Sequence, residues 1–157
     1  KINYVDNLKQ GENKRYYESG ELESTTNYVD DLRQEYKYYY KNGQLSSKIN
    51  YVDNLKQGEN KRYYETGELK STRNYVDDYG FGQEIYYYKS GKLKSTANNG
   101  TGMFHGMKQG KSKEYYETGE LRSTVNYVDG VMEGESKEYY KSGELKSTEN
   151  YVAGVKQ

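Results

Sequence analysis

The sequence contains no cysteine, no tryptophan and only one histidine, and it is poor in aliphatic side chains. Without cysteine the chain can form neither a disulfide nor a thiolate metal site. Leu, Val, Ile and Phe account for only 23 of the 157 residues, a fraction typical of chains that lack a packed core. We therefore exclude a large three-dimensional core and expect a thin layer that buries Tyr, Leu and Val.

An excess of charge is also absent, because 24 basic residues balance 24 acidic ones. Proteins that bind nucleic acids usually carry a clear positive excess, and binding to an acidic membrane surface needs a basic cluster. No apolar run reaches the length of a membrane span. We therefore expect no nucleic-acid partner and no membrane association.

Tyrosine is abundant, with 22 copies. Disordered chains are poor in aromatic residues and carry a large net charge, and this chain shows neither property. The sequence therefore predicts a folded protein in spite of its few aliphatic side chains.

A repeat runs through the whole chain. A Gly-x-Leu tripeptide recurs six times, with two adjacent tyrosines before each glycine, a serine four positions after it and an asparagine seven positions after it. The anchoring glycines are Gly20, Gly43, Gly67, Gly91, Gly119 and Gly143. We divide the single array 1–157 into a half repeat 1–10 and repeats 11–33, 34–57, 58–81, 82–109, 110–133 and 134–157.

The repeat is typical of a β-hairpin, because Tyr, Thr and Val cluster in short segments between turn residues. Glu18-Ser19-Gly20 fits a type I turn followed by a glycine in the left-handed region. This turn sets Tyr17 opposite Glu21 and Tyr16 opposite Leu22. Strict alternation then predicts two faces. One face carries Tyr16, Leu22, Ser24 and Tyr28, and the other carries Tyr17, Glu23, Thr25 and Asn27.

The predicted fold is all-β, an elongated single-layer antiparallel β-meander or solenoid of stacked hairpin repeats of about 24 residues each. Six hairpins and a leading strand over 1–5 give about thirteen strands. Both chain ends fall inside a repeat, so we expect further repeats, a cap, or edge-to-edge self-association through open strand edges.

The repeated Gly-Glu-x-Lys-x-Tyr-Tyr-x-x-Gly-x-Leu-x-Ser and Asn-Tyr-Val segments resemble the MORN repeat, most of all the bacterial variant in antitoxin-like proteins. The resemblance covers essentially the whole chain. It implies an array of β-hairpins and a role in protein interaction or scaffolding, while lipid binding has been proposed for eukaryotic relatives. The antitoxin label implies a toxin as partner, although no residue here matches such a role.

The stretch TyrTyrTyrLysAsnGlyGln at 38–44 is also similar to the cell-wall-binding repeats of bacterial surface proteins. That similarity implies binding of a cell-wall or host glycan as an alternative function. Members that hold choline use aromatic cages, usually with tryptophan, and the absence of tryptophan counts against that use. A bacterial cell-envelope or secreted location is favoured over the cytoplasm, without fixing the compartment.

Two groups of residues are candidates for partner binding. The first is a ladder made by the second tyrosine of each pair, since tyrosine offers contact area at low entropic cost. Its members are Tyr17, Tyr40, Tyr64, Tyr88, Tyr116 and Tyr140. In the alternative interpretation, these rings only stack on one another and cover the sheet.

The second candidate is an insertion near 99–106 that interrupts the fourth repeat. It brings together Met103, Phe104, His105 and Met107, and exposed apolar loops on rigid scaffolds often bind partners. In the alternative interpretation, the apolar side chains fill the space of a missing Tyr-Val pair.

The sequence does not predict an enzyme. It lacks a nucleophile motif and a phosphate-binding loop, and we expect no catalytic residue, no cofactor and no metal. The Asp pairs at 30–31 and 77–78 lack the ligand spacing of a calcium loop, so we interpret them as solvated turns.

Overall fold

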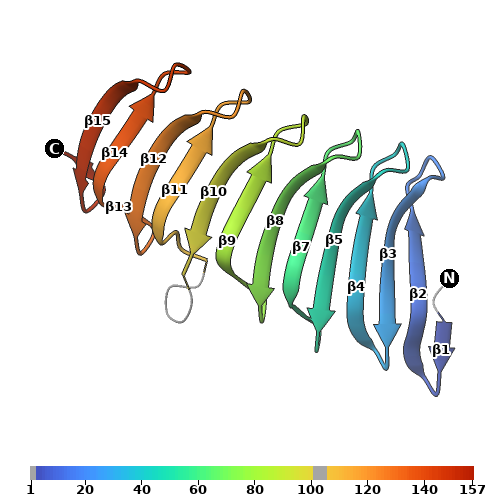
Figure 1. Cartoon of the computed structure of the whole chain (residues 1–157). Helices are drawn as coiled ribbons and strands as arrows, with labels where there is room; N and C mark the ends of the chain where they lie inside the picture. The colour runs from blue at the N-terminus through green and yellow to red at the C-terminus, as the bar shows by residue number, and fades with distance from the viewer. Residues whose placement is uncertain (1–2, 101–105) are drawn as a thin grey trace. The chain divides into compact units, whose positions relative to one another are not determined.

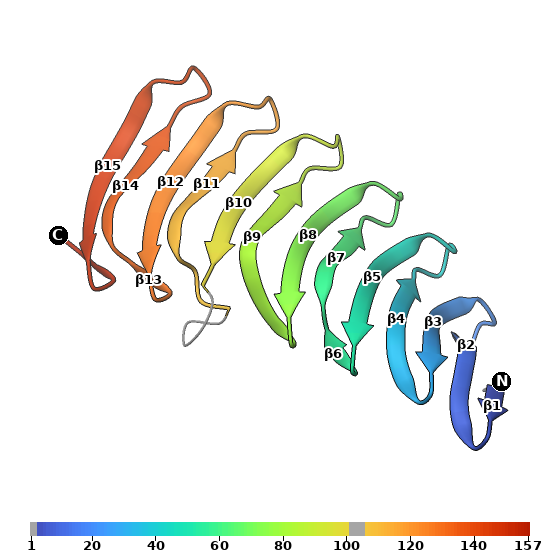
Figure 2. The same ribbon diagram turned by 60° about the horizontal axis from the view of Figure 1, so that its bottom comes forward.

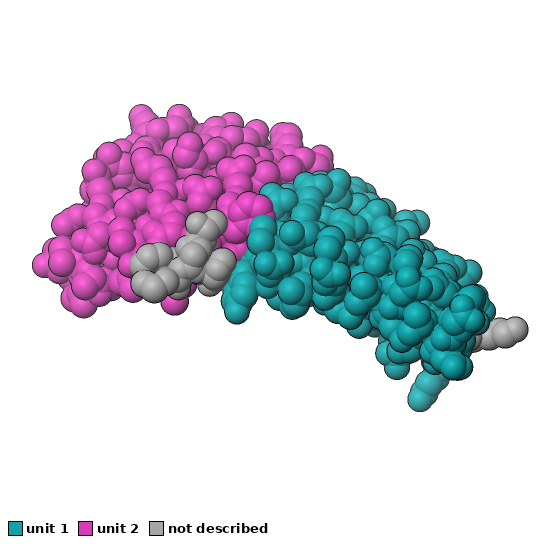
Figure 3. Space-filling model, turned by 90° about the horizontal axis from the view of Figure 1, so that it is seen from below, with its two compact units in different colours: residues 1–79 teal, residues 80–157 magenta. Residues whose placement is uncertain are grey.

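The computed structural model describes residues 3–100 and 106–157. Every regular element in these ranges is a β-strand, which confirms the predicted all-β class. The chain divides into two compact units, unit 1 over Lys1–Tyr79 and unit 2 over Gly80–Gln157 (Figure 3). Each unit is described separately below.

Unit 1 contains eight strands. They are β1 (Asn3–Val5), β2 (Leu8–Tyr16), β3 (Leu22–Val29), β4 (Leu32–Tyr39), β5 (Leu45–Val52), β6 (Leu55–Lys56), β7 (Gly58–Tyr63) and β8 (Leu69–Val76). The next strand, β9 (Tyr79–Tyr87), begins at the last residue of unit 1. The remaining strands of unit 2 are β10 (Leu93–Asn99), β11 (Gly110–Tyr115), β12 (Leu121–Val128), β13 (Val131–Met132), β14 (Gly134–Tyr139), β15 (Leu145–Val152) and β16 (Val155–Lys156).

Strands that follow each other in the sequence lie side by side within each unit and pair antiparallel (Figure 1). This arrangement confirms the predicted single-layer meander. The described ranges hold three strands more than the thirteen expected. The three are the two-residue strands β6, β13 and β16, which pair next to a tight turn with β5, β12 and β15.

The hairpin turn has the predicted geometry. In the first repeat the Tyr17 amide donates to the Glu21 carbonyl at 2.9 Å, and the Gly20 amide donates to the Tyr17 carbonyl at 2.9 Å. Gly20 has a φ of 99°, a conformation that only glycine adopts at little cost. In unit 1 these loops lie at one end of the strands and the tighter turns lie at the other (Figure 2).

A β-bulge next to every hairpin turn makes the predicted division of faces wrong. Tyr16 pairs with Leu22 as expected, but Arg15 pairs with Ser24, so Glu23 is an extra residue in β3. The bulge shifts the alternation by one position. Ser24 and Tyr28 therefore leave the face of Tyr16 and Leu22. The same register shift occurs in the other five hairpins.

The turns between hairpins are two-residue turns with φ positive at both positions, such as Asp30 at 48° and Asp31 at 62°. These values are those of a type I′ turn, which Asp and Asn tolerate. Both residues are exposed, as the interpretation of solvated turns requires. The turn also ties one repeat to the previous one, because the Asp31 carboxylate accepts the Lys9 amide at 2.8 Å. In the same way, the Asn54 side-chain oxygen accepts the Arg33 amide, and the Asp78 carboxylate accepts the Lys56 amide.

The interior of the sheet is polar. Tyr51, 8% exposed, is the one buried hydrophobic side chain among the described residues, and the others are small polar groups such as Ser24 and Thr72. A single layer has no second sheet to cover its faces, so most Leu and Tyr side chains are half-buried or exposed. The repeated valine is exposed, for example 54% at Val52, which differs from the predicted burial of Val.

Candidate functional site

The predicted tyrosine ladder holds successive repeats together. The Tyr17 hydroxyl donates to the Tyr39 carbonyl of the next repeat at 2.7 Å, and the Tyr40 hydroxyl donates to the Tyr63 carbonyl at 2.9 Å. In unit 2, Tyr88 and Tyr116 make the equivalent bonds to Tyr115 and Tyr139, at 2.6 and 2.7 Å. Binding of a partner by this row stays a prediction, but four hydroxyls already have a backbone acceptor.

A neighbouring ring and several cations approach the rings of this ladder. Tyr17 meets Tyr38 edge to face, with centroids 6.3 Å apart, and its ring is approached by the Lys41 ammonium at 5.8 Å. The neighbouring Tyr38 hydroxyl, together with partial burial, raises the pKa of Tyr17 to about 12. In the same ladder, the Lys70 ammonium lies over the Tyr64 ring at 5.5 Å. Tyr140, the last member, is 51% exposed.

The second candidate, the insertion near 99–106, belongs only in part to the described residues. Met103, Phe104 and His105 lie outside the described residues. Met107 is described and is 46% exposed, with its carbonyl accepting the Gly100 amide at 2.8 Å. A contact role for this loop stays a prediction.

The strand register instead reveals a basic and aromatic surface in unit 1, which we call the Tyr–Arg face. Cross-strand pairs place one row of side chains on it, since directly paired residues point to the same side. That row is Arg15, Ser24, Tyr38, Ser47, Arg62 and Ser71. A second row contains Asn13, Thr26, Tyr36 and Ile49, followed by Asn60 and Arg73.

Near the type I′ turns, the Tyr–Arg face carries alternating cations and tyrosines. Lys9 lies over the Tyr28 ring at 5.4 Å, Arg33 lies over the Tyr51 ring at 4.8 Å, and Lys56 lies over the Tyr75 ring at 5.4 Å. Each is a cation–π contact, which attracts a cation to the ring face. Burial opposes the charge of Arg33, but the nearby Tyr51 and Tyr28 hydroxyls still hold its pKa above the ordinary value.

The Tyr–Arg face therefore carries six cations, and the rows named above include no carboxylate. The six are Lys9, Arg15, Arg33, Lys56, Arg62 and Arg73. Arg15 and Arg62 are exposed, and neither has an ion pair with any described residue. A small hollow of about 100 Å³ opens on this face between Ser47, Asn60, Arg62 and Tyr75.

In unit 2, glutamates replace the exposed arginines of this row. Glu114 and Glu138 occupy the repeat position of Arg15 and Arg62, and both pair with Ser123. These carboxylates have their own cations, since Glu138 contacts Lys146 at 2.9 Å and Glu114 lies 4.0 Å from Arg122. The two units thus present different chemistry from one repeat pattern.

The other side of unit 1 carries balanced charges, and we call it the Lys–Glu face. Lys37, Lys48 and Lys61 stand directly opposite one another on β4, β5 and β7. Glu35 contacts Lys37 at 2.5 Å and Lys48 at 2.6 Å. Burial opposes its ionisation, yet hydrogen bonds from both lysines hold the pKa of Glu35 below the ordinary value.

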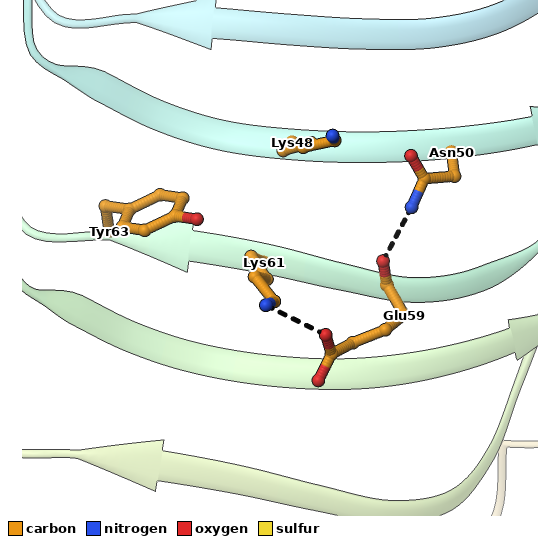
Figure 4. A pocket seen from close by; sticks show the side chains of 5 residues that line it. All are labelled: Lys48, Asn50, Glu59, Lys61 and Tyr63. Carbon is orange, nitrogen blue, oxygen red and sulfur yellow. Dashed lines mark hydrogen bonds and ion pairs between the residues drawn. The ribbon is translucent and has the colours of Figure 1, made fainter.

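A hollow of about 310 Å³ lies on the Lys–Glu face (Figure 4). In it the Asn50 side-chain amide donates to the Glu59 carbonyl at 2.9 Å, and the Lys61 ammonium contacts the Glu59 carboxylate at 3.0 Å. Lys48 and Tyr63 complete the lining. Both lysines of this hollow therefore have a glutamate partner, Glu59 for Lys61 and Glu35 for Lys48, unlike Arg15 and Arg62 on the opposite side.

Sequence reasoning missed the Tyr–Arg face because it assumed strict alternation. One extra residue after each Leu moves the rest of that strand to the other side, so Ser24 and Tyr28 were assigned to the wrong face. The zero net charge also hid the separation of charges between faces.

Within the described residues, no three side chains of the His, Cys, Asp or Glu type come together as a metal-binding group. The described part of the chain also has no helix of the length and apolar character that crossing a bilayer requires.

Comparison with known families gives a match along most of the chain. Six segments match a family model described as a MORN repeat variant. They are residues 9–30, 35–53, 56–77, 82–98, 108–129 and 132–153. The segments follow the predicted hairpins, including the hairpin before the insertion.

No curated protein matches the chain. Among solved structures, one titled "Crystal structure of GtfA/B complex bound to UDP and GlcNAc" is 17% identical and covers 70% of this chain, with a TM-score of 0.29. This chain spans 21% of that structure's chain. A likeness at this level carries no argument about fold or function.

Proposed function

Because the chain belongs to the family of MORN repeat variants, we propose that it acts as a non-enzymatic protein-interaction or scaffolding module. Repeats of this family are generally protein- or lipid-binding modules. The observation that supports the proposal is the double linkage between repeats. A tyrosine hydroxyl joins them at the hairpin end, as in Tyr17 to Tyr39, and a turn side chain joins them at the other end, as in Asp31 to Lys9.

Such linkage fixes the spacing of side chains along a sheet face. A face with fixed spacing binds a partner without the entropic cost of ordering each side chain on association. Rows of Tyr and Arg are common at protein interfaces, where they supply much of the binding energy. The proposal therefore assigns partner recognition to a sheet face and not to an enclosed pocket.

The alternative partner is a cell-wall or host glycan. Sugars stack on open aromatic rings, whereas Tyr17, Tyr64 and Tyr116 of the ladder each have a cation over the ring. This observation favours a protein partner over a glycan. The finer form of the proposal is a bacterial antitoxin-like role, in which the protein partner is a toxin.

The experiment is affinity capture on the immobilised chain, followed by reconstitution of the complex from purified components. The expected result is a defined complex with one identified protein, and a toxin among the captured proteins would support the antitoxin-like form. The same preparation is applied to a glycan array and to liposomes in a flotation assay. Specific glycan binding, or flotation at physiological salt without any protein complex, would contradict the proposal.

A further inference from the structure

The Tyr–Arg face of unit 1 carries two exposed arginines that no described carboxylate pairs with. Arg15 and Arg62 are exposed and have no ion pair with the described residues. Lys14 and Lys61, which are their immediate neighbours in the sequence, point to the opposite face and pair with Glu12 and Glu59 at 3.0 Å each. The difference between adjacent residues indicates that the charge of the Tyr–Arg face is available to a partner.

The spacing of the two free arginines fits an extended ligand. Arg15 lies on β2 and Arg62 on β7, four strand positions further along unit 1. Neighbouring strands are about 4.8 Å apart, so the two positions are separated by about 19 Å. An extended peptide rises about 3.3 Å per residue and covers this distance in about six residues.

The chemistry of the face fits carboxylates. Arginine offers a planar fork of donors that matches a carboxylate, and the pairing is stronger than a neutral hydrogen bond. In the row between the two arginines lie Ser24, Tyr38 and Ser47. The short Ser47 side chain, beside the small hollow next to Arg62, leaves room for a glutamate or aspartate side chain to reach that guanidinium group.

Single-stranded nucleic acid is also an extended anion, but it binds proteins largely by stacking its bases on aromatic rings. The rings of Tyr28, Tyr51 and Tyr75 already carry Lys9, Arg33 and Lys56 on their faces. Bases would have to displace these cations. An acidic peptide needs no stacking, because its carboxylates can bind the cations and the tyrosine hydroxyls without moving them.

We propose that the Tyr–Arg face of unit 1 binds an extended acidic segment of a partner protein, running across the strands from β2 to β7. This inference rests on the proposed function, because it names the chemistry of the partner and the surface that recognises it. The acidic segment would place carboxylates at intervals of about six residues, one near each exposed arginine.

The test measures binding of a fluorescent twelve-residue glutamate-rich peptide to the full chain by anisotropy. The variant Arg15→Glu/Arg62→Glu is compared with Lys14→Glu/Lys61→Glu, which makes the same charge change at adjacent residues on the other face. We expect the arginine variant to weaken binding at least tenfold and the lysine variant to change it less than about threefold. Circular dichroism confirms that each variant is folded.

Each of five outcomes would overturn the inference. Equal weakening by both variants would mean that only the overall charge matters. Tighter binding of an oligothymidine probe, lost in the arginine variant, would identify nucleic acid as the ligand. No peptide binding at millimolar concentration, or self-association of the chain that the arginine variant abolishes, would also reject it. If a captured protein partner still binds the arginine variant, the inference fails while the proposed function stands.

Discussion

At the scale of single residues, the second tyrosine of a pair links its repeat to the next one, a role that the sequence does not predict. The Tyr40 hydroxyl donates to the Tyr63 carbonyl, and the same bond recurs at Tyr17, Tyr88 and Tyr116. A bond to the backbone of the next repeat is independent of that repeat's side chains. This independence explains why tyrosine is kept at the position while flanking residues change between Glu and Lys.

Replacing Tyr40 with Phe removes the hydroxyl and leaves the Tyr63 carbonyl without its partly buried donor. We expect the free energy of unfolding to fall by about 0.5–1.5 kcal/mol. Urea denaturation followed by circular dichroism measures the change. Tyr140→Phe is the matched control, because Tyr140 occupies the same repeat position and donates no hydrogen bond to any described residue. An equal loss in both variants would contradict this role.

The raised pKa of Tyr17 predicts a loss of stability in alkali. A folded-state pKa of about 12, above the ordinary 10.0, means that the fold favours the protonated phenol. The stabilisation is complete below pH 10 and is lost as the pH rises from about 10 toward 12. Urea titrations at pH 8, 10 and 11.5 measure this loss. In Tyr17→Phe, which has no ionisable group, the fall should be shallower, and an identical slope would exclude Tyr17 as a cause.

At the scale of elements, the hairpin turns were predictable from the sequence and the bulges were not. The glycine at position 20 predicts a positive φ, because glycine adopts this conformation at little energetic cost. The bulge at Glu23 has no such signal. The residue at the bulge is Glu, Ser, Lys or Arg in different repeats. Residue type therefore does not mark the position of the bulge.

The turn glycine can be tested where a side chain would meet no obstacle. A Cβ added at Gly43 would have no atom within 4 Å, so the φ of 83° is the only source of strain. We expect Gly43→Ala to lower the free energy of unfolding by about 1–2 kcal/mol and Gly43→Asn to lower it less. Thermal denaturation of the three proteins gives the ranking. Equal stability of the alanine variant would show that the turn does not require the left-handed conformation.

At the scale of the whole molecule, the balance of charge conceals its distribution. The sum of zero led us to expect no anionic partner of the nucleic-acid type. Within unit 1, that sum hides the difference between a Lys–Glu face whose charges are paired and a Tyr–Arg face that carries the exposed, unpaired Arg15 and Arg62. The all-β meander was predictable from periodicity and turn residues, and the repeat family from the resemblance of the repeated motif to it. The candidate surface was not, because it depends on which side of the strand Arg15 and Arg62 occupy.

The placement of side chains on the two faces is the central claim, and engineered disulfides in this cysteine-free chain test it most directly. The bulge places Lys61 opposite Thr72, whereas strict alternation would place it opposite Ser71. Directly opposed residues lie within disulfide range, and residues on opposite faces do not. Mass spectrometry after mild oxidation should find a cross-link in Lys61→Cys/Thr72→Cys and none in Lys61→Cys/Ser71→Cys. A cross-link in the second variant alone would contradict the register and, with it, the Tyr–Arg face.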